Sequence, residues 1–287
     1  MASLFVWIQR LLPKYLLTAV VYRLARIRHV ATKDFLIRRF VQLYDVDIES
    51  LSHPVPEGYP TFNDFFIREL APGARKVDDT PGAIVSPVDG TVSAAGRIEE
   101  DRLFQAKGLD YSLTDLLATD VADVSTYANG EFATIYLAPY NYHRVHAPVD
   151  GELQSLRYVP GGLYSVNEAT VSKLPRLFAR NERLVCHVKT PHGPMVLIFV
   201  GALNVGTIHT RWTGDIRPRS GGVVEAIDLR QPAHPLAFSR GDTLGWFNMG
   251  STVILLFPEG VAAGFGELAA GQTVQMGEVL GNARSPK

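Results

Sequence analysis

The chain has 287 residues, of which 46% are hydrophobic and 20% charged, a composition typical of a globular protein with a sizeable core. Its single cysteine, Cys186, excludes an intrachain disulfide and a cysteine-based metal cluster. The net charge of −1 conceals a basic N-terminal segment, because residues 1–40 carry eight basic side chains and one acidic side chain, Asp34. Such an asymmetry indicates that this segment meets something anionic.

Apolar residues recur at helical spacing from Leu4 to Leu24, with Lys14 and Arg23 among them. This pattern predicts an amphipathic helix, which Pro13 either kinks or divides in two. Its apolar runs are far shorter than the roughly 18–20 residues of a spanning helix, and no secretory signal is expected. The pattern favours a helix lying in a membrane interface. The alternative is a helix packed on its own domain or on a partner subunit.

A second amphipathic helix is predicted over residues 35–44, followed by a proline-rich connection at 52–60. A helix over 61–70 should come next, with Thr61 or Asn63 as its cap. We therefore expect two units, a membrane-associating helical unit at 1–58 and a β-rich unit at 59–287.

From about residue 84 onward, short β-like runs alternate with glycine, proline and aspartate. The clearest strand is 132–137, runs 184–188 and 195–200 should pair as a hairpin, and a short helix is expected within 110–128. Segments 86–92 and 147–153 both contain a Pro-Val-Asp-Gly turn that leads into a strand. This repeat predicts an α+β fold that is predominantly β, a duplicated small β-sandwich or barrel of the lipoyl-like kind preceded by amphipathic helices. It is a fold analogy and carries no chemistry by itself.

The most informative stretch is the buried strand predicted at 253–257, because Gly250 and Ser251 stand just before it. A hydroxyl directly after a glycine, where a turn enters a strand, can bend back on the preceding carbonyl, and that carbonyl belongs to Gly250. The simpler interpretation is a Gly-Ser-Thr turn at the end of a core strand, since such short patterns are common.

A serine hydroxyl is a poor nucleophile unless a base lies nearby. The best candidates are His143 and His146, which follow the strand at 132–137 at a loop edge that can project polar groups into a site. Histidines three residues apart can also share a zinc ion, but neither a cysteine pair nor a His-Glu motif supplies further ligands, so no metal is expected. Two surface histidines are the other alternative.

Segment 240–254 resembles, along its length, the processing segment of phosphatidylserine decarboxylases, the pyruvoyl-dependent, self-processing proenzymes of bacterial type. Blocks 61–75 and 201–208 and the Tyr-His-Arg-Val-His run at 142–146 are also similar to that family. The family usually has leucine where this chain has Met249, a swap that conserves volume.

The resemblance implies that the chain is cut between Gly250 and Ser251 and that Ser251 becomes a covalent pyruvoyl group, the cofactor. It also implies that His146 is the base for processing, that His143 serves decarboxylation, and that Asp89, in the turn at 86–90, orients His146. Such an arrangement of serine, histidine and aspartate is recognised by geometry and not by order along the chain.

The same resemblance implies the reaction and the partners. Phosphatidylserine would form a Schiff base with the pyruvoyl ketone, lose carbon dioxide and leave as phosphatidylethanolamine. The two fragments should stay associated, and we expect a homodimer without nucleic acid, held peripherally on the cytoplasmic face of the cell membrane by the N-terminal helices.

Two other functions remain open from the residues alone. One is a non-enzymatic lipoyl- or biotinyl-like β module, although the chain has no Met-Lys-Met or Asp-Lys-Ala attachment turn. The other is a serine hydrolase that uses Asp89, His146 and Ser251, although no Gly-x-Ser-x-Gly elbow is present. The intact mass separates these functions, because only the decarboxylase cuts its own chain.

Overall fold

The structure is a computed structural model that describes residues 7, 9, 11–119, 121–204, 206–219 and 221–284. It is mostly strand with few helices, 34% and 20% of residues, which confirms the α+β class with a predominance of β structure. The duplicated lipoyl-like sandwich stays a prediction.

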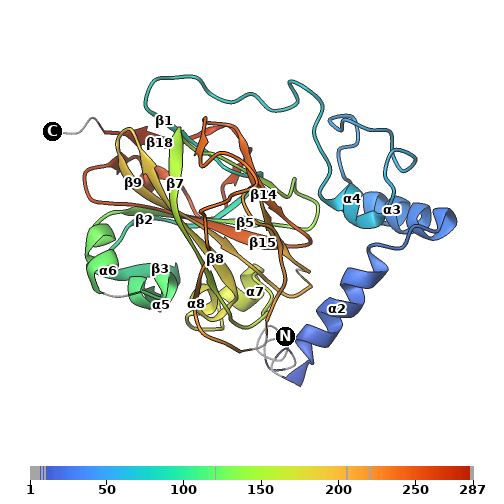
Figure 1. The fold of residues 1–287 in the computed structure, drawn as a ribbon, viewed down its shortest axis with the longest axis horizontal. Helices are drawn as coiled ribbons and strands as arrows, with labels where there is room; N and C mark the ends of the chain where they lie inside the picture. The colour runs from blue at the N-terminus through green and yellow to red at the C-terminus, as the bar shows by residue number, and fades with distance from the viewer. Residues whose placement is uncertain are drawn as a thin grey trace.

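The N-terminal part forms a helical arm beside the β-rich body (Figure 1). Its helices are α2 (Lys14–Leu24), α3 (Val30–Tyr44) and α4 (Phe62–Phe66). Helix α2 begins directly after Pro13, which therefore starts a helix and does not kink one. Helix α4 is shorter than predicted, but Thr61 does cap it, since the Thr61 hydroxyl accepts a hydrogen bond from the Asp64 amide at 3.1 Å.

The arm has a hydrophobic core of its own, separate from that of the β-rich body. Aromatic rings dominate this core, and Phe40 packs edge-on against Phe62, Phe65 and Phe66 at centroid distances of 5.3 to 6.0 Å. The core takes side chains from both sides of residue 58, so the boundary between the two predicted units stays a prediction. None of the helices in the described residues has the length and apolarity needed to cross a membrane.

The body is organised around an antiparallel sheet in which β15 (Ser251–Phe257) occupies a central position, paired with β9 (Gly193–Val200) on one side and β5 (Glu131–Leu137) on the other. Every residue of β15 is buried, which confirms the core strand expected before residue 258. The predicted strand and hairpin are also confirmed, as β5 and as the pair β8 and β9. The order in the sheet is β12 (Glu225–Ala226), β7 (Gly151–Val159), β8 (Arg183–Thr190), β9 (Gly193–Val200), β15 (Ser251–Phe257), β5 (Glu131–Leu137), β2 (Gly90–Arg97) and β17 (Thr273–Val274), with β13 (Ala237–Phe238) also on β7.

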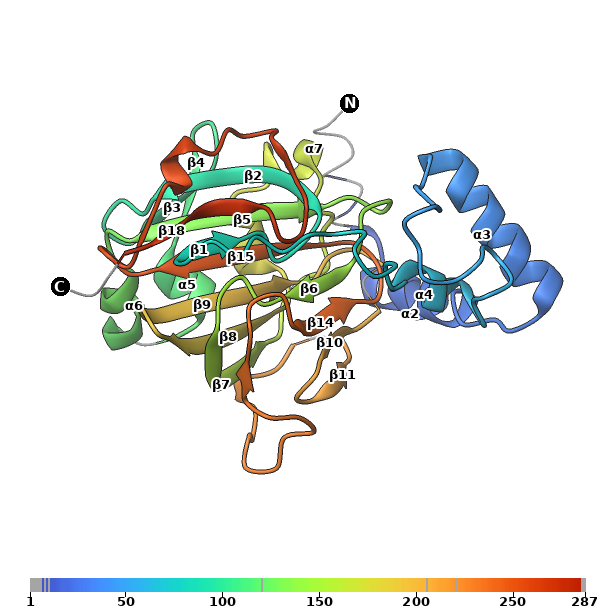
Figure 2. The ribbon, with the colours of Figure 1, turned by 90° about the horizontal axis from the view of Figure 1, so that it is seen from above.

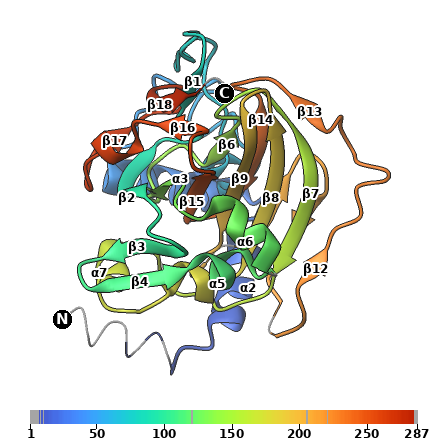
Figure 3. The same cartoon turned by 90° about the vertical axis from the view of Figure 1, so that its left-hand side faces the viewer.

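Further elements cover the two faces of this sheet (Figures 1 and 3). On one face lie the hairpin β3 (Arg102–Ala106) and β4 (Leu109–Ser112) and the short helices α5 (Leu113–Leu117), α6 (Val121–Tyr127), α7 (Glu168–Val171) and α8 (Leu177–Arg180). The single helix predicted within 110–128 is thus two helices. Two smaller sheets and the 3₁₀ turn η1 (Phe265–Glu267) complete the body. One has the order β11 (Gly214–Ile216), β10 (Ile208–Thr210), β14 (Thr243–Phe247) and β6 (Arg144–His146). The other has the order β1 (Ala83–Val85), β18 (Val279–Ala283) and β16 (Ala262–Ala263).

The pair β6 and β14 positions the candidate site, because it lies between the main sheet and the helical arm (Figure 2). Phe247 of β14 contacts Phe199 of β9 at a ring-centroid distance of 5.4 Å, so the smaller sheet packs directly on the main one. The loop from β14 to β15 carries the Gly-Ser pair from one layer to the other.

Candidate active site

The Gly-Ser pair lies in a tight connection whose backbone is in the left-handed half of conformational space. Met249 has a φ of 91° and Gly250 a φ of 47°. Glycine adopts such angles freely, but for Met249 this conformation costs roughly 1–3 kcal/mol. A side chain at position 250 would meet nothing within 4 Å, so the backbone angle is what calls for glycine here. The strain therefore lies at Met249, the residue before Gly250.

Ser251 is the first residue of β15, and its hydroxyl is fully buried. Side chains alternate along a strand, so Ser251 shares a face with Val253, which pairs with Phe199. Because Phe199 packs on Phe247, this face looks toward the β6–β14 layer. Among the described residues the Ser251 hydroxyl has no hydrogen-bond partner, a situation that costs about 1–3 kcal/mol in a folded protein. Such an unpaired buried group calls for an explanation, and a role as a reacting group is one explanation.

His143 precedes β6 and is completely buried against the ring of Phe66, at a centroid distance of 4.2 Å. Its carbonyl accepts the Phe247 amide, so in antiparallel pairing its ring lies on the face that carries Phe247. Its Nδ1 lies 2.8 Å from the Asn141 carbonyl, and because a carbonyl only accepts, Nδ1 carries the proton. Nε2 is then a bare acceptor without a partner in the described part of the chain. Burial, helped by the charge of Arg68, lowers the pKa of His143 to about 3, so the ring is neutral.

Arg68 is a site residue that sequence reasoning missed, although it lies in a block that was singled out. It is 4% exposed and donates to the Tyr140 carbonyl at 2.7 Å and to the Asn141 carbonyl at 3.1 Å. The Asn141 carbonyl is also the acceptor for His143, so Arg68 fixes the loop that sets the tautomer of that histidine. Burial lowers the pKa of Arg68 to about 10, which leaves the guanidinium charged at neutral pH.

His146 ends β6 and is held by two different partners. Its Nδ1 donates to the Gly241 carbonyl at 2.7 Å, and its Nε2 accepts from the Tyr142 hydroxyl at 2.9 Å. Burial lowers the pKa of His146, and burial also raises the pKa of Tyr142 to about 12, so the phenol keeps its proton. The loop predicted to carry the two histidines is therefore partly strand, since His146 belongs to β6. Tyr142 is a second site residue to which the sequence analysis assigned no role.

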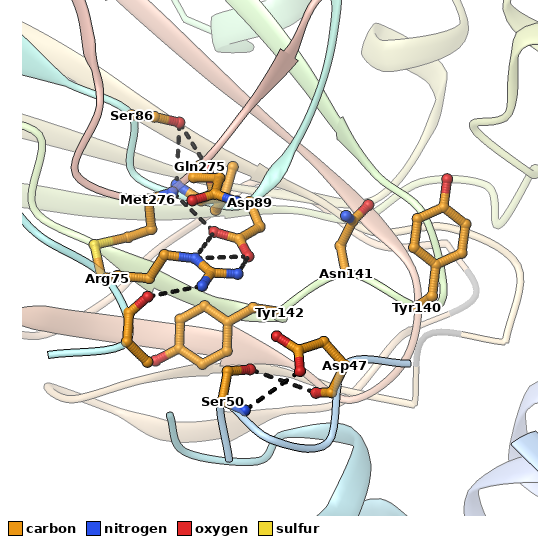
Figure 4. Close-up of polar contacts among 12 residues, drawn as sticks. Asp47, Ser50, Arg75, Ser86, Asp89, Tyr140, Asn141, Tyr142, Gln275 and Met276 are labelled. Atoms are coloured by element: carbon orange, nitrogen blue, oxygen red, sulfur yellow. Dashed lines mark hydrogen bonds and ion pairs between the residues drawn. The ribbon is translucent and has the colours of Figure 1, made fainter. Parts of the chain in front are cut away.

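Asp89 stands at the entry to β2, where its carboxylate is held by Arg75 (Figure 4). Arg75 donates through its Nε at 3.1 Å and through a terminal nitrogen at 2.6 Å, and the Met276 amide donates at 2.8 Å. No hydrogen bond joins Asp89 to the ring of His146 among the described residues. The negative charge of Asp89 nevertheless acts to raise the pKa of His146, against the larger effect of burial. The orienting role expected for Asp89 stays a prediction, since the Gly241 carbonyl already fixes the His146 tautomer.

The candidate residues are thus a serine, two neutral histidines and a paired carboxylate, residue types used in nucleophilic catalysis. Among the described residues no hydrogen bond joins Ser251 to either histidine. In the described residues no group of three histidine, cysteine or acidic side chains is arranged to hold a metal ion.

Comparisons with known proteins place the chain in a family. A family model described as phosphatidylserine decarboxylase matches residues 62–282, and a second model, described as PSD, matches residues 4–45. A Methylococcus capsulatus protein named phosphatidylserine decarboxylase proenzyme is 45% identical over 282 residues, 98% of this chain and 97% of that protein. A protein of the same name from Psychrobacter arcticus is 44% identical over 283 residues, 98% of this chain and 99% of that protein. Another from Acidovorax ebreus is 45% identical over 272 residues, 95% of each chain. The chain belongs to the phosphatidylserine decarboxylase family.

Proposed function

We propose that this chain cuts itself between Gly250 and Ser251 and then decarboxylates phosphatidylserine to phosphatidylethanolamine. The observation that carries the proposal is the buried, unpartnered Ser251 hydroxyl, two residues after the strained Met249, in a chain whose relatives are named as proenzymes.

Cleavage requires that Ser251 lose its proton and that its oxygen attack the Gly250 carbonyl carbon. The amide bond to the Ser251 nitrogen then breaks as an ester forms. Removal of the proton on the Ser251 α-carbon expels the Gly250 carboxylate, and addition of water with loss of ammonia leaves a keto group at residue 251. By the family resemblance His146 is the base for these proton transfers, and Asp89 supports it.

In the uncut chain Nε2 of His146 is occupied by the Tyr142 hydroxyl, so Tyr142 must turn away before His146 can act as the base. Nε2 of His143, by contrast, is already bare. We therefore test the two histidines separately. His146→Gln should leave the chain uncut, and His143→Gln should be cut but inactive. An intact-mass result in which only His143→Gln stays uncut would reverse the two roles.

The surroundings of residue 251 fit a pyruvoyl group. The space beside Gly250 is open, the Ser251 hydroxyl has no hydrogen-bond partner in the described residues, and His143, on the facing layer, is uncharged. Once formed, the group supplies a ketone that condenses with the substrate amine and accepts the electron pair when carbon dioxide leaves. His143 contributes a neutral acceptor nitrogen, held in place by the Asn141 carbonyl, for the substrate's polar head.

The primary experiment compares Ser251→Ala with Thr252→Ala by intact mass under denaturing conditions. Thr252 is the matched control, because its hydroxyl is also buried and unpartnered in the described residues but points to the opposite face of β15. We expect wild type and Thr252→Ala to appear as two fragments and Ser251→Ala as one chain without activity. A cut Ser251→Ala chain, or an active uncut wild type, would contradict the proposal.

After the cut the fragments should stay associated. The small fragment begins with β15, which pairs along its length with β5 and for most of its length with β9, both in the large fragment. Native mass spectrometry should therefore show the two fragments together where denaturing conditions show them apart. The homodimer that we expect would appear in the same spectrum as two copies of each fragment.

We further propose that the helical arm holds the protein peripherally on the cytoplasmic face of the cell membrane. Leu16, Val20 and Leu24 lie four residues apart on α2 and are 64%, 42% and 51% exposed. Together with the basic residues of this segment they suit an anionic interface. Leu16→Glu with Val20→Glu should abolish flotation with vesicles that contain anionic lipid, whereas Val223→Glu, at an exposed residue of the body, should not.

A further inference from the structure

The buried acid Glu182 takes no part in the chemistry described so far. It stands just before β8 and is 1% exposed, and its only hydrogen bond from a described side chain comes from the Tyr158 hydroxyl at 3.0 Å. Burial raises its pKa to about 8, against the smaller opposite effect of the Tyr158 bond. The carboxyl therefore carries a proton at neutral pH, a state that is uncommon outside functional sites.

The register of the main sheet places Glu182 in line with the Gly-Ser pair. At the end of the ladder Val200 of β9 pairs with Arg183 of β8 on one side and with Thr252 of β15 on the other. Continued by one residue beyond these last pairs, the register aligns Glu182, then Gly201, then Ser251 in one row. The Gly201 amide donates to the Glu182 carbonyl at 2.9 Å, which continues the pairing of β8 with β9 by one residue.

All members of this row share one face of the sheet, because residues opposite each other in antiparallel strands point the same way. Gly201 stands between the other two and has no side chain to separate them. A Cβ added there would lie 2.7 Å from Cγ and from Oε1 of Glu182. The Glu182 carboxyl thus extends over Gly201, on the side of the row that leads to Ser251.

The hydrogen bonds around Tyr158 show which oxygen of Glu182 carries the proton. The Arg219 amide donates to the Tyr158 oxygen at 3.1 Å, so the Tyr158 hydroxyl is free to donate to Oε2 of Glu182. An oxygen that accepts this hydrogen bond is the poorer place for the acid proton. The proton belongs on Oε1, the buried oxygen over Gly201, which has no partner in the described residues.

Neither histidine of the site offers such a proton. Both rings have their Nδ1 proton engaged by a backbone carbonyl, of Asn141 for His143 and of Gly241 for His146. Their Nε2 atoms are acceptors, and both rings are uncharged at neutral pH because burial lowers both pKa values. An acid is nevertheless needed, since a ketone oxygen leaves as water only after it has been protonated.

We propose, on the basis of the proposed function, that Glu182 is a further catalytic residue that protonates the ketone oxygen at position 251. As the substrate amine bonds to the keto carbon, Glu182 gives its Oε1 proton to the departing oxygen. The carbon–oxygen bond breaks, and the oxygen leaves as water with that proton and one from the amine nitrogen. Glu182 is left as a carboxylate beside the new positive charge on the nitrogen.

The test measures the reaction of the ketone with an amine reagent and not turnover of the lipid. Purified, cut protein is treated with phenylhydrazine from pH 6 to pH 9, and the mass shift of the small fragment is followed with time. Glu182→Gln keeps the shape and a donor group but cannot transfer a proton, and Glu259→Gln, at a side chain 63% exposed, is the matched control. Loss of a general acid should slow adduct formation about 100-fold and remove the fall in rate above pH 8.

Equal rates and pH profiles in Glu182→Gln and wild type would overturn the assignment, and so would an uncut Glu182→Gln chain, because Glu182 would then act before the ketone exists. If Glu182→Gln does not fold, Tyr158→Phe replaces it. Loss of the Tyr158 hydroxyl removes a donor to the ionised carboxylate and so raises the pKa of Glu182. The fall in the rate of adduct formation must then move to higher pH, and a fall at the same pH as in wild type refutes the proposal. A wild type that is uncut and unreactive would instead overturn the proposed function itself.

Discussion

The backbone strain at Met249 can be tested separately from the packing of its side chain. Met249→Gly removes the side chain that a φ of 91° disfavours, while Met249→Ala keeps the strain. Both variants lose the partial packing of Met249 against the core of the helical arm, so the difference between them isolates the strain. If the strain amounts to about 2 kcal/mol and is released as the bond to Ser251 breaks, Met249→Gly should be cut about thirtyfold more slowly than Met249→Ala.

The assay follows newly made chain, because purified wild type would already be cut. Each variant is synthesised in a cell-free system, quenched in denaturant at intervals and resolved by intact mass. In a Ser251→Ala background, which keeps the chain whole, urea unfolding should show Met249→Gly about 1–2 kcal/mol more stable than Met249→Ala. Equal cleavage rates of the two variants would refute the idea that strain contributes to processing, even if their stabilities differ.

Three further predictions concern His143, Tyr142 and Arg75, and each is measured by urea unfolding or by a cleavage time course. The buried His143 has a pKa of about 3 in the folded chain and an ordinary value of 6.5 when unfolded, so it takes up a proton only on unfolding. The free energy of unfolding should therefore fall by about 2 kcal/mol between pH 7 and pH 5, and this fall should be smaller in His143→Gln. Tyr142→Phe frees Nε2 of His146, so the chain should be cut at least as fast as wild type; slower cleavage would make the phenol a proton relay. Arg75→Met leaves the buried carboxylate of Asp89 without its ion-pair partner and should destabilise the uncut chain by roughly 3–5 kcal/mol, whereas an effect under 1 kcal/mol would contradict the pairing.

Local patterns in the sequence were sufficient for the elements that carry the site. The apolar run of β15, the hairpin of β8 and β9 and the Thr61 cap all follow from residues adjacent in the chain. The bounds of α4 and the split of the helix into α5 and α6 were not predicted, because tertiary packing decides where such short helices end.

The partners of the site residues could not be predicted in the same way. Arg75 and Met276 meet at Asp89 from distant parts of the chain, and no periodicity connects them. Glu182 is the clearest case, since the sequence Asn-Glu-Arg around it is typical of an exposed turn and yet it is buried. Only the alignment of three strands shows that Gly201 leaves room for its carboxyl.

The position of the Gly250–Ser251 bond at the very start of β15 suits the proposed cut, because a chain cut there can keep its shape. A cut inside a strand would leave two strand ends to fray, whereas this cut severs only the strained connection from β14 and leaves all the strand pairs of β15 intact. In the proposed cut the strain would be released, and the new terminus at residue 251 would stay paired with Leu137 of β5, next to Thr252, which pairs with β9. The Ser251 side chain lies on the face that looks toward the β6–β14 layer, so under the proposed function the sheet that positions the serine for cleavage would also position the group formed from it.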